Sequence, residues 1–91
     1  MAIYLITYDL REAQYEEALL DYLKKGEWKE ITKSSYAVIR SNSPSEIVAD
    51  IRKITKNSNT AITVYVLPIK GPSDGLGPKD VNDWLNQNLL T

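Results

Sequence analysis

The sequence predicts an α+β fold built on one antiparallel sheet, and three observations carry this prediction. Residues 2–9 form a run of apolar, aromatic and β-branched residues that ends in a single carboxylate, Asp9. Such a run is typical of a central strand that is covered on both faces. Two segments with the spacing of amphipathic helices follow, and a pair of short strand-like segments separates them.

In the first predicted strand, alternate side chains point to opposite faces of the sheet. One face receives Ile3, Leu5 and Thr7, together with Asp9 where the strand ends. The other face receives Tyr4, Ile6 and Tyr8. Asp9 is therefore either a turn or helix-capping residue, or a reactive group held at the end of a rigid element.

Two helices are predicted from periodicity and from their end signals. Residues 13–25 carry an apolar stripe at helical spacing, and Gly26 is a natural stop in the left-handed conformation. The second helix begins at Ser43-Pro44-Ser45-Glu46, in which Ser43 and Glu46 have the spacing of a capping box and Pro44 suits the first helical position.

Three further strands are predicted at residues 28–32, 35–40 and 60–67. The Gly- and Pro-rich segment 71–78 indicates a flexible connector, because its spacing matches neither a Walker loop nor a dinucleotide-binding fingerprint. A last helix carries Val81, Trp84, Leu85 and Leu89 at helical spacing, and this stripe needs a surface to cover. We expect a domain at residues 1–70, with residues 71–91 packing on that domain or on a dimer partner.

The order β-α-β-β-α-β is that of the ferredoxin-like split βαβ fold, here with an added C-terminal helix. Right-handed crossovers place the first and third strands in the centre and both helices on one face. The opposite face is then bare, and an apolar bare face indicates a docking surface. A homodimer, or aromatic stacking on a single-stranded nucleic acid, would cover it.

Composition excludes several kinds of chemistry. The chain has 91 residues with no Cys and no His, so it has no disulfide, thiol nucleophile, imidazole base or zinc site of the usual kind. A metal would have to be a hard cation held by oxygens, such as Mg²⁺ or Mn²⁺. The net charge of −1 provides no general attraction for nucleic acid. No signal peptide or membrane-spanning segment is predicted, so we expect a cytoplasmic protein.

Several short motifs resemble a known family. Tyr8-Asp9-Leu10 ends the first strand, Trp28 opens the hairpin, Ser34-Ser35-Tyr36 begins an aromatic strand, and Trp84-Leu85 lies in the last helix. This pattern resembles the small CRISPR adaptation nuclease superfamily, which also holds VapD-type toxin ribonucleases and small bacterial and phage proteins of unassigned function. The resemblance to this last group is the strongest.

The resemblance implies a symmetric dimer in which two copies of Asp9 hold a divalent cation, with Tyr8 and Ser35 as neighbours. Nuclease members tend to carry basic residues after the aspartate, whereas here Arg11 is followed by Glu12, Glu16 and Glu17, whose charges would repel a phosphate backbone. The favoured hypothesis is therefore a non-catalytic or weakly catalytic dimeric binding or regulatory protein, with nucleic acid or another protein as its ligand. The alternative is a metal-dependent endonuclease acting on RNA or DNA. The expected binding and interface residues are Tyr4, Tyr8, Ser35, Tyr36 and Trp84.

Overall fold

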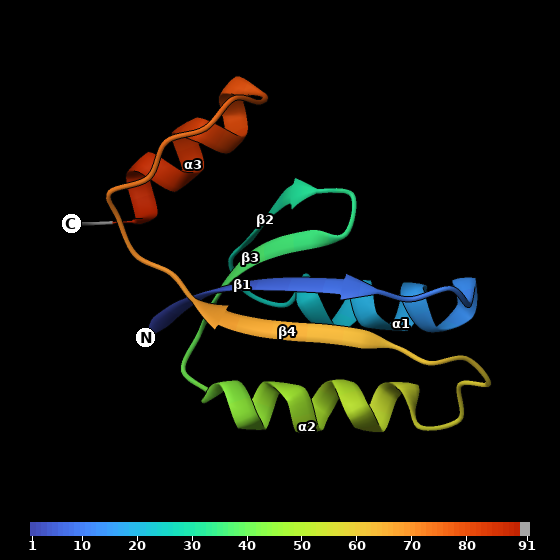
Figure 1. The fold of residues 1–91 in the computed structure, drawn as a ribbon. Helices are drawn as coiled ribbons and strands as arrows, with labels where there is room; N and C mark the ends of the chain where they lie inside the picture. The colour runs from blue at the N-terminus through green and yellow to red at the C-terminus, as the bar shows by residue number, and fades with distance from the viewer. Residues whose placement is uncertain (90–91) are drawn as a thin grey trace.

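The computed structural model describes residues 1–89 and contains a four-stranded antiparallel sheet and three helices (Figure 1). In chain order the elements are β1 (Ala2–Asp9), α1 (Ala13–Leu23), β2 (Trp28–Thr32), β3 (Ser35–Arg40), α2 (Pro44–Thr55), β4 (Thr63–Pro68) and α3 (Lys79–Asn88). The α+β class, the element order and the C-terminal helix are as predicted. Within residues 1–89, no helix is both long and apolar enough to cross a bilayer.

The sheet has the strand order β2-β3-β1-β4, so β1 and β3 are central and β2 and β4 are the edges. Strand β1 pairs with β3 through Leu5 and Ala37, and with β4 through Leu5 and Leu67. The pairing of β2 with β3 is interrupted by a bulge between Glu30 and Thr32.

Helices α1 and α2 cover one face of the sheet, where the core lies. The core is the cluster Tyr4, Ile6, Tyr8, Leu10, Leu19, Leu23, Tyr36, Val38, Ile47 and Ile51. All three β1 residues in this cluster have the same parity, which is the face division predicted from alternation. We call the opposite face, which carries Ile3, Leu5 and Thr7 of β1, the helix-free face, because neither α1 nor α2 packs on it; α3 lies over part of it, beside β2.

The ends of the two core helices follow from local chemistry. Ser43 and Glu46 form the predicted capping box, with the Ser43 Oγ accepting from the Glu46 backbone N–H at 3.2 Å. Helix α1 ends two residues earlier than predicted, at Leu23, and Gly26 then takes the left-handed conformation with φ 76°. Arg40 donates to the carbonyl oxygens of Tyr22 and Leu23, at 2.9 Å in each case, and so satisfies the end of α1.

Strand β4 begins later than predicted, at Thr63 rather than residue 60. The reason is local, because the loop before it is held by a carboxylate. One Glu12 oxygen accepts from the backbone N–H groups of Asn59 and Thr60, at 2.8 and 3.0 Å, and from the hydroxyl of Ser58 at 2.9 Å. These donors are therefore committed to the loop and not to the strand.

Candidate functional site

Asp9 lies at the exposed end of β1, where its backbone pairs with Thr63 of β4. Its carboxylate makes no hydrogen bond or ion pair with residues 1–89. The Asp9 side chain therefore neither caps a helix nor closes a turn. The residue before α1 in the capping position is Glu12, which is likewise without a capping bond to the helix. Asp9 therefore has the free carboxylate that a ligand-binding role requires.

A shallow pocket of about 450 Å³ opens beside Asp9. It is lined by Tyr8, Asp9, Leu10, Glu16, Lys33 and Ser34, and so joins the end of β1 to the start of α1 and to the turn between β2 and β3. One carboxylate from β1 and one from α1 thus share this pocket with a single lysine.

The electrostatics of the pocket are mainly acidic. Burial raises the pKa of the Tyr8 hydroxyl, and the negative charges of Glu16 and Glu30 raise it further. No group of three or more Asp and Glu residues in the described part of the chain is placed to hold a metal ion. A cation at Asp9 would therefore need oxygens from a second copy or from a substrate, as the resemblance implies.

Three of the expected binding and interface residues lie in the core and not on an exposed face. Tyr4, Tyr8 and Tyr36 are 5%, 5% and 2% exposed, and they belong to the core beneath α1 and α2. The expectation that they form a surface for docking is corrected by this burial. A tyrosine can be buried in this way because its ring packs while its hydroxyl reaches a polar partner at the margin of the core.

The hydroxyl groups of these three residues show this arrangement. Tyr4 donates to the Asn42 carbonyl at 2.8 Å, Tyr8 donates to the Lys33 carbonyl at 3.4 Å, and Tyr36 donates to Glu30 at 2.8 Å. Burial raises the pKa of Tyr36, and its hydrogen bond to Glu30 raises it further.

Ser35 lies at the start of β3, opposite Thr7 of β1, on the helix-free face. Its hydroxyl is 2.6 Å from that of Thr32, and the residue is buried. It therefore closes the hairpin turn near the Asp9 end of the sheet but is not presented to a ligand.

The helix-free face carries the exposed apolar side chains that the tyrosines were expected to supply. Tyr65 and Leu67 of β4 are 60% and 46% exposed, and they pair across the strands with Thr7 and Leu5. Neither residue is among the expected binding and interface residues. The signal that could have found Leu67 is its even spacing from Tyr65, which places both on one face.

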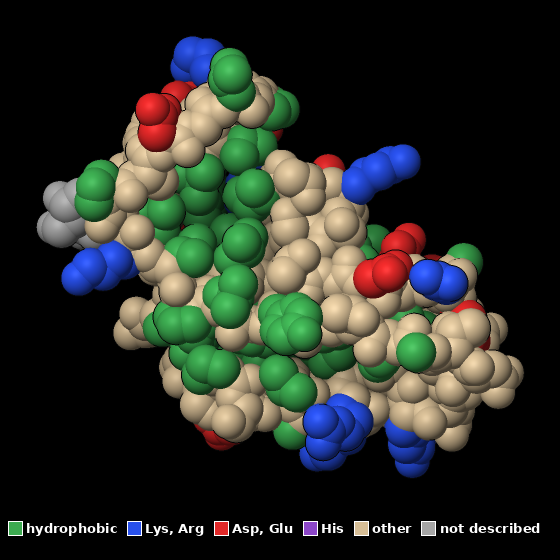
Figure 2. Space-filling view, viewed as in Figure 1, with side chains coloured by type: hydrophobic (Ala, Val, Ile, Leu, Met, Phe, Trp, Pro, Cys, Tyr) green, Lys and Arg blue, Asp and Glu red, His purple; other side chains and the backbone are tan. Residues whose placement is uncertain are grey.

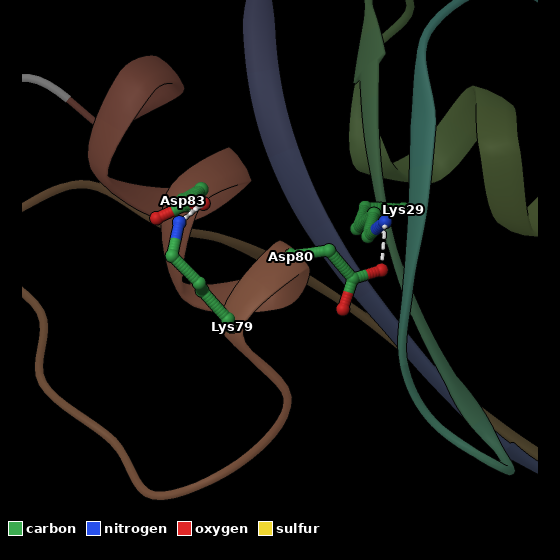
Figure 3. Close-up of polar contacts among 4 residues, drawn as sticks. All are labelled: Lys29, Lys79, Asp80 and Asp83. Atoms are coloured by element: carbon green, nitrogen blue, oxygen red, sulfur yellow. Dashed lines mark hydrogen bonds and ion pairs between the residues drawn. The ribbon is translucent and has the colours of Figure 1, made fainter.

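Helix α3 lies on the helix-free side and leaves part of that face open. The Lys29 Nζ of β2 is 2.6 Å from the Asp80 Oδ2, and a second ion pair joins Lys79 to Asp83 within α3 (Figure 3). Trp84 and Leu85 are half-buried. Figure 2 shows apolar side chains filling the hollow between α3 and the sheet and continuing over the strands.

The comparisons with known proteins give no match: no family model, no curated protein and no solved structure is similar to this chain. What is established is a small α+β fold with a four-stranded antiparallel sheet, a free carboxylate at the end of its central strand, and an apolar face that two helices leave uncovered.

Proposed function

We propose that this chain is a non-catalytic or weakly catalytic binding protein that acts as a homodimer, built on a ferredoxin-like split βαβ domain. The sheet order supports the fold assignment, because β2-β3-β1-β4 read from the other edge is 4-1-3-2. The resemblance to the CRISPR adaptation nuclease superfamily supports the dimer. The observation that carries the proposal is the helix-free face.

Along its two neighbouring strands, β1 and β4, that face is apolar, and its one charged side chain is Asp9 at the end of β1. On β1 it presents Ile3, Leu5 and Thr7, and on β4 it presents Tyr65 and Leu67. A fully buried leucine stabilises by about 1.5–3 kcal/mol relative to an exposed one, so exposed apolar side chains grouped on one face favour association. A two-fold axis uses the same patch on both copies, so every buried side chain counts twice.

The charge of the molecule gives a weaker argument about which ligand the dimer binds. The Asp9 pocket is mainly acidic, and the net charge of −1 gives no general attraction for a phosphate backbone. Another protein is therefore the favoured ligand, and a nucleic acid is the other candidate. Affinity for a nucleic acid would fall steeply as salt is raised, whereas affinity for a protein would change little.

Light scattering at micromolar concentration tests the dimer. Leu67→Ser should weaken it by on the order of 30-fold, because symmetry removes a half-exposed leucine from both sides. Leu76→Ser is the matched control, because Leu76 is fully exposed in the segment before α3. A wild-type chain that stays monomeric, or equal effects of the two substitutions, would exclude the proposal.

A second candidate function is a divalent-metal-dependent endonuclease, and the free carboxylate of Asp9 favours it. In this case Asp9 from two copies would hold Mg²⁺ or Mn²⁺, and the cation would polarise a phosphate and lower the pKa of an attacking water. The test is incubation with single- and double-stranded RNA and DNA in either metal, with and without EDTA. Cleavage should be lost in Asp9→Asn and kept in Asp21→Asn, whose carboxylate lies on the exposed side of α1.

A further inference from the structure

The two edges of the sheet are built differently. Edge strand β2 carries Lys29 and Glu30, has a bulge after Glu30, and is followed by Lys33. Charges and bulges are the usual means by which proteins prevent an edge strand from pairing with another chain. Residues 60–69, which include β4, contain no charged side chain, and β4 pairs with β1 in an unbroken register. Edge β4 therefore has neither charges nor a bulge, and Pro68 at its C-terminal end is the one position of the strand that cannot donate.

The hydrogen-bonding direction of β4 follows from its register. The Ile69 backbone N–H donates to the Ile3 carbonyl at 3.0 Å, and residues 3 and 69 oppose one another in the same register. In an antiparallel ladder the bonded pairs alternate, so Leu67 and Tyr65 also direct their backbone groups toward β1. Val64 and Val66 direct theirs away from the sheet, where no strand lies beyond β4 in the described chain (Figure 1).

We infer that the outer edge of β4 is the site where a second copy of this chain adds its own β4, antiparallel and related by a two-fold axis. This inference rests on the proposed homodimer and specifies how it forms. Two such edges are complementary because each is uncharged and each offers Val64 and Val66 as donor and acceptor.

Pro68 selects the register of this pairing. It has no backbone N–H, so it can accept from a partner strand but cannot donate to it. An axis at Tyr65 places Val64 opposite the partner's Val66, and both valines then exchange two hydrogen bonds with their partners. An axis at Val66 would instead place Val64 opposite the partner's Pro68 and lose a donor on each side.

The same register joins the helix-free faces of the two copies. Residues directly opposite one another in an antiparallel pair point to the same face, and the axis at Tyr65 makes the two Tyr65 rings neighbours. The two copies would form one continuous sheet, with Tyr65 and Leu67 of both copies on one apolar surface. This pairing therefore satisfies the exposed edge and enlarges the apolar surface, but it does not cover that surface.

Amide hydrogen exchange of the purified full-length chain, followed as a function of concentration, tests the inference. The amides of Val64 and Val66 should become protected by on the order of tenfold or more as the dimer forms, and lose this protection on dilution. The control is internal: Trp28 and Glu30 of β2 also direct their amides outward, since the Ile39 N–H donates to the Glu27 carbonyl. Their exchange should not depend on concentration.

A pair of proline substitutions gives a second test. Val66→Pro removes an outward N–H and should give a monomer, whereas Glu30→Pro removes the corresponding N–H of β2 and should leave the dimer intact. Circular dichroism establishes that each variant is folded. The exchange experiment uses the wild-type chain, so it does not depend on the folding of either variant. A wild-type dimer whose Val64 and Val66 amides exchange as fast as those of Trp28 and Glu30 would overturn the edge pairing and leave the proposed dimer standing. A monomer at all concentrations would overturn both.

Discussion

Lys29 and Asp80 form the ion pair that joins β2 to the first turn of α3, with 2.6 Å between the Lys29 Nζ and the Asp80 Oδ2 (Figure 3). Lys29 lies on the helix-free face, because it pairs with Ala37, which in turn pairs with Leu5. The Lys29 side chain holds the pKa of the Asp80 carboxyl below its usual value by hydrogen bonding and by charge. The pair therefore links α3 to β2.

Lys29→Met should loosen α3, because it keeps the aliphatic part of the side chain and removes the charge. We expect amide exchange in α3 to rise by up to about fivefold, as for other exposed ion pairs, and less at high salt. Lys79→Met is the control, since it breaks only the pair with Asp83 inside the helix. Equal exchange in the two variants would show that the link to β2 contributes nothing to docking.

The sequence predicted the strand pattern well, and it placed the tyrosines poorly. Alternation shows that Tyr4, Ile6 and Tyr8 share a face, but it does not show whether α1 and α2 cover that face or the opposite one. Both faces of β1 are apolar, so the composition of the strand leaves this undecided. The hydroxyl groups of the buried tyrosines donate to partners such as the Asn42 carbonyl. Because these partners are distant in sequence, the strand pattern does not predict them.

The candidate site was also predicted only in part. Asp9 was found because it ends a regular element, and its position needs no tertiary information. Glu12 was predicted only as an unfavourable charge beside it. Its hydrogen bonds to Ser58, Asn59 and Thr60 join residues 46 to 48 positions apart, and no periodic pattern predicts such contacts.

Glu12→Gln should lower the Tm at neutral pH. Desolvation of the Glu12 carboxyl opposes its ionisation, but hydrogen bonds from Ser58, Asn59 and Thr60 outweigh this and lower its pKa in the folded state. The stabilisation is therefore present above the unfolded pKa of about 4.5 and is lost as the pH falls through the lower folded value. The Tm difference between wild type and Glu12→Gln should be largest at neutral pH and shrink in acid.

Glu17→Gln is the matched control for this experiment, because Glu17 is exposed on the same helix and makes no hydrogen bond with residues 1–89 through its side chain. Its Tm should follow that of the wild type across the pH range. A Glu12→Gln deficit that does not change with pH would show that the carboxylate charge is not what holds the loop.

Tyr22→Phe should remove part of the stability at moderate pH and flatten its decline in alkali. Burial raises the pKa of Tyr22 to about 12, assisted by the hydrogen bond that its hydroxyl donates to Asp50 at 2.9 Å. The protonated form is favoured in the folded state, so its stabilisation is complete below pH 10 and is lost as the pH rises through 12. Tyr15→Phe, whose hydroxyl has no hydrogen-bond partner in residues 1–89, should leave the alkaline profile unchanged.

Ile6 and Leu5 are neighbours on β1 that test which face is the core. Ile6 is fully buried beneath the helices, whereas Leu5 lies half-buried on the helix-free face. Ile6→Ala should therefore lower the free energy of unfolding by about 2–5 kcal/mol, because it removes transfer energy and leaves a cavity. That is a large part of the roughly 5–15 kcal/mol available to a domain. Leu5→Ala should lower the free energy of unfolding by clearly less, because the Leu5 side chain is already partly exposed to solvent. This is measured by denaturant unfolding at concentrations low enough to keep the chain monomeric. Pairing of the β4 edges leaves Leu5 on the open face of the joined sheet, so the cost of Leu5→Ala should not change at high concentration. A rise toward the cost of Ile6→Ala would show that a second copy stacks on the helix-free face. Equal costs at every concentration would instead mean that α1 and α2 do not distinguish the two faces.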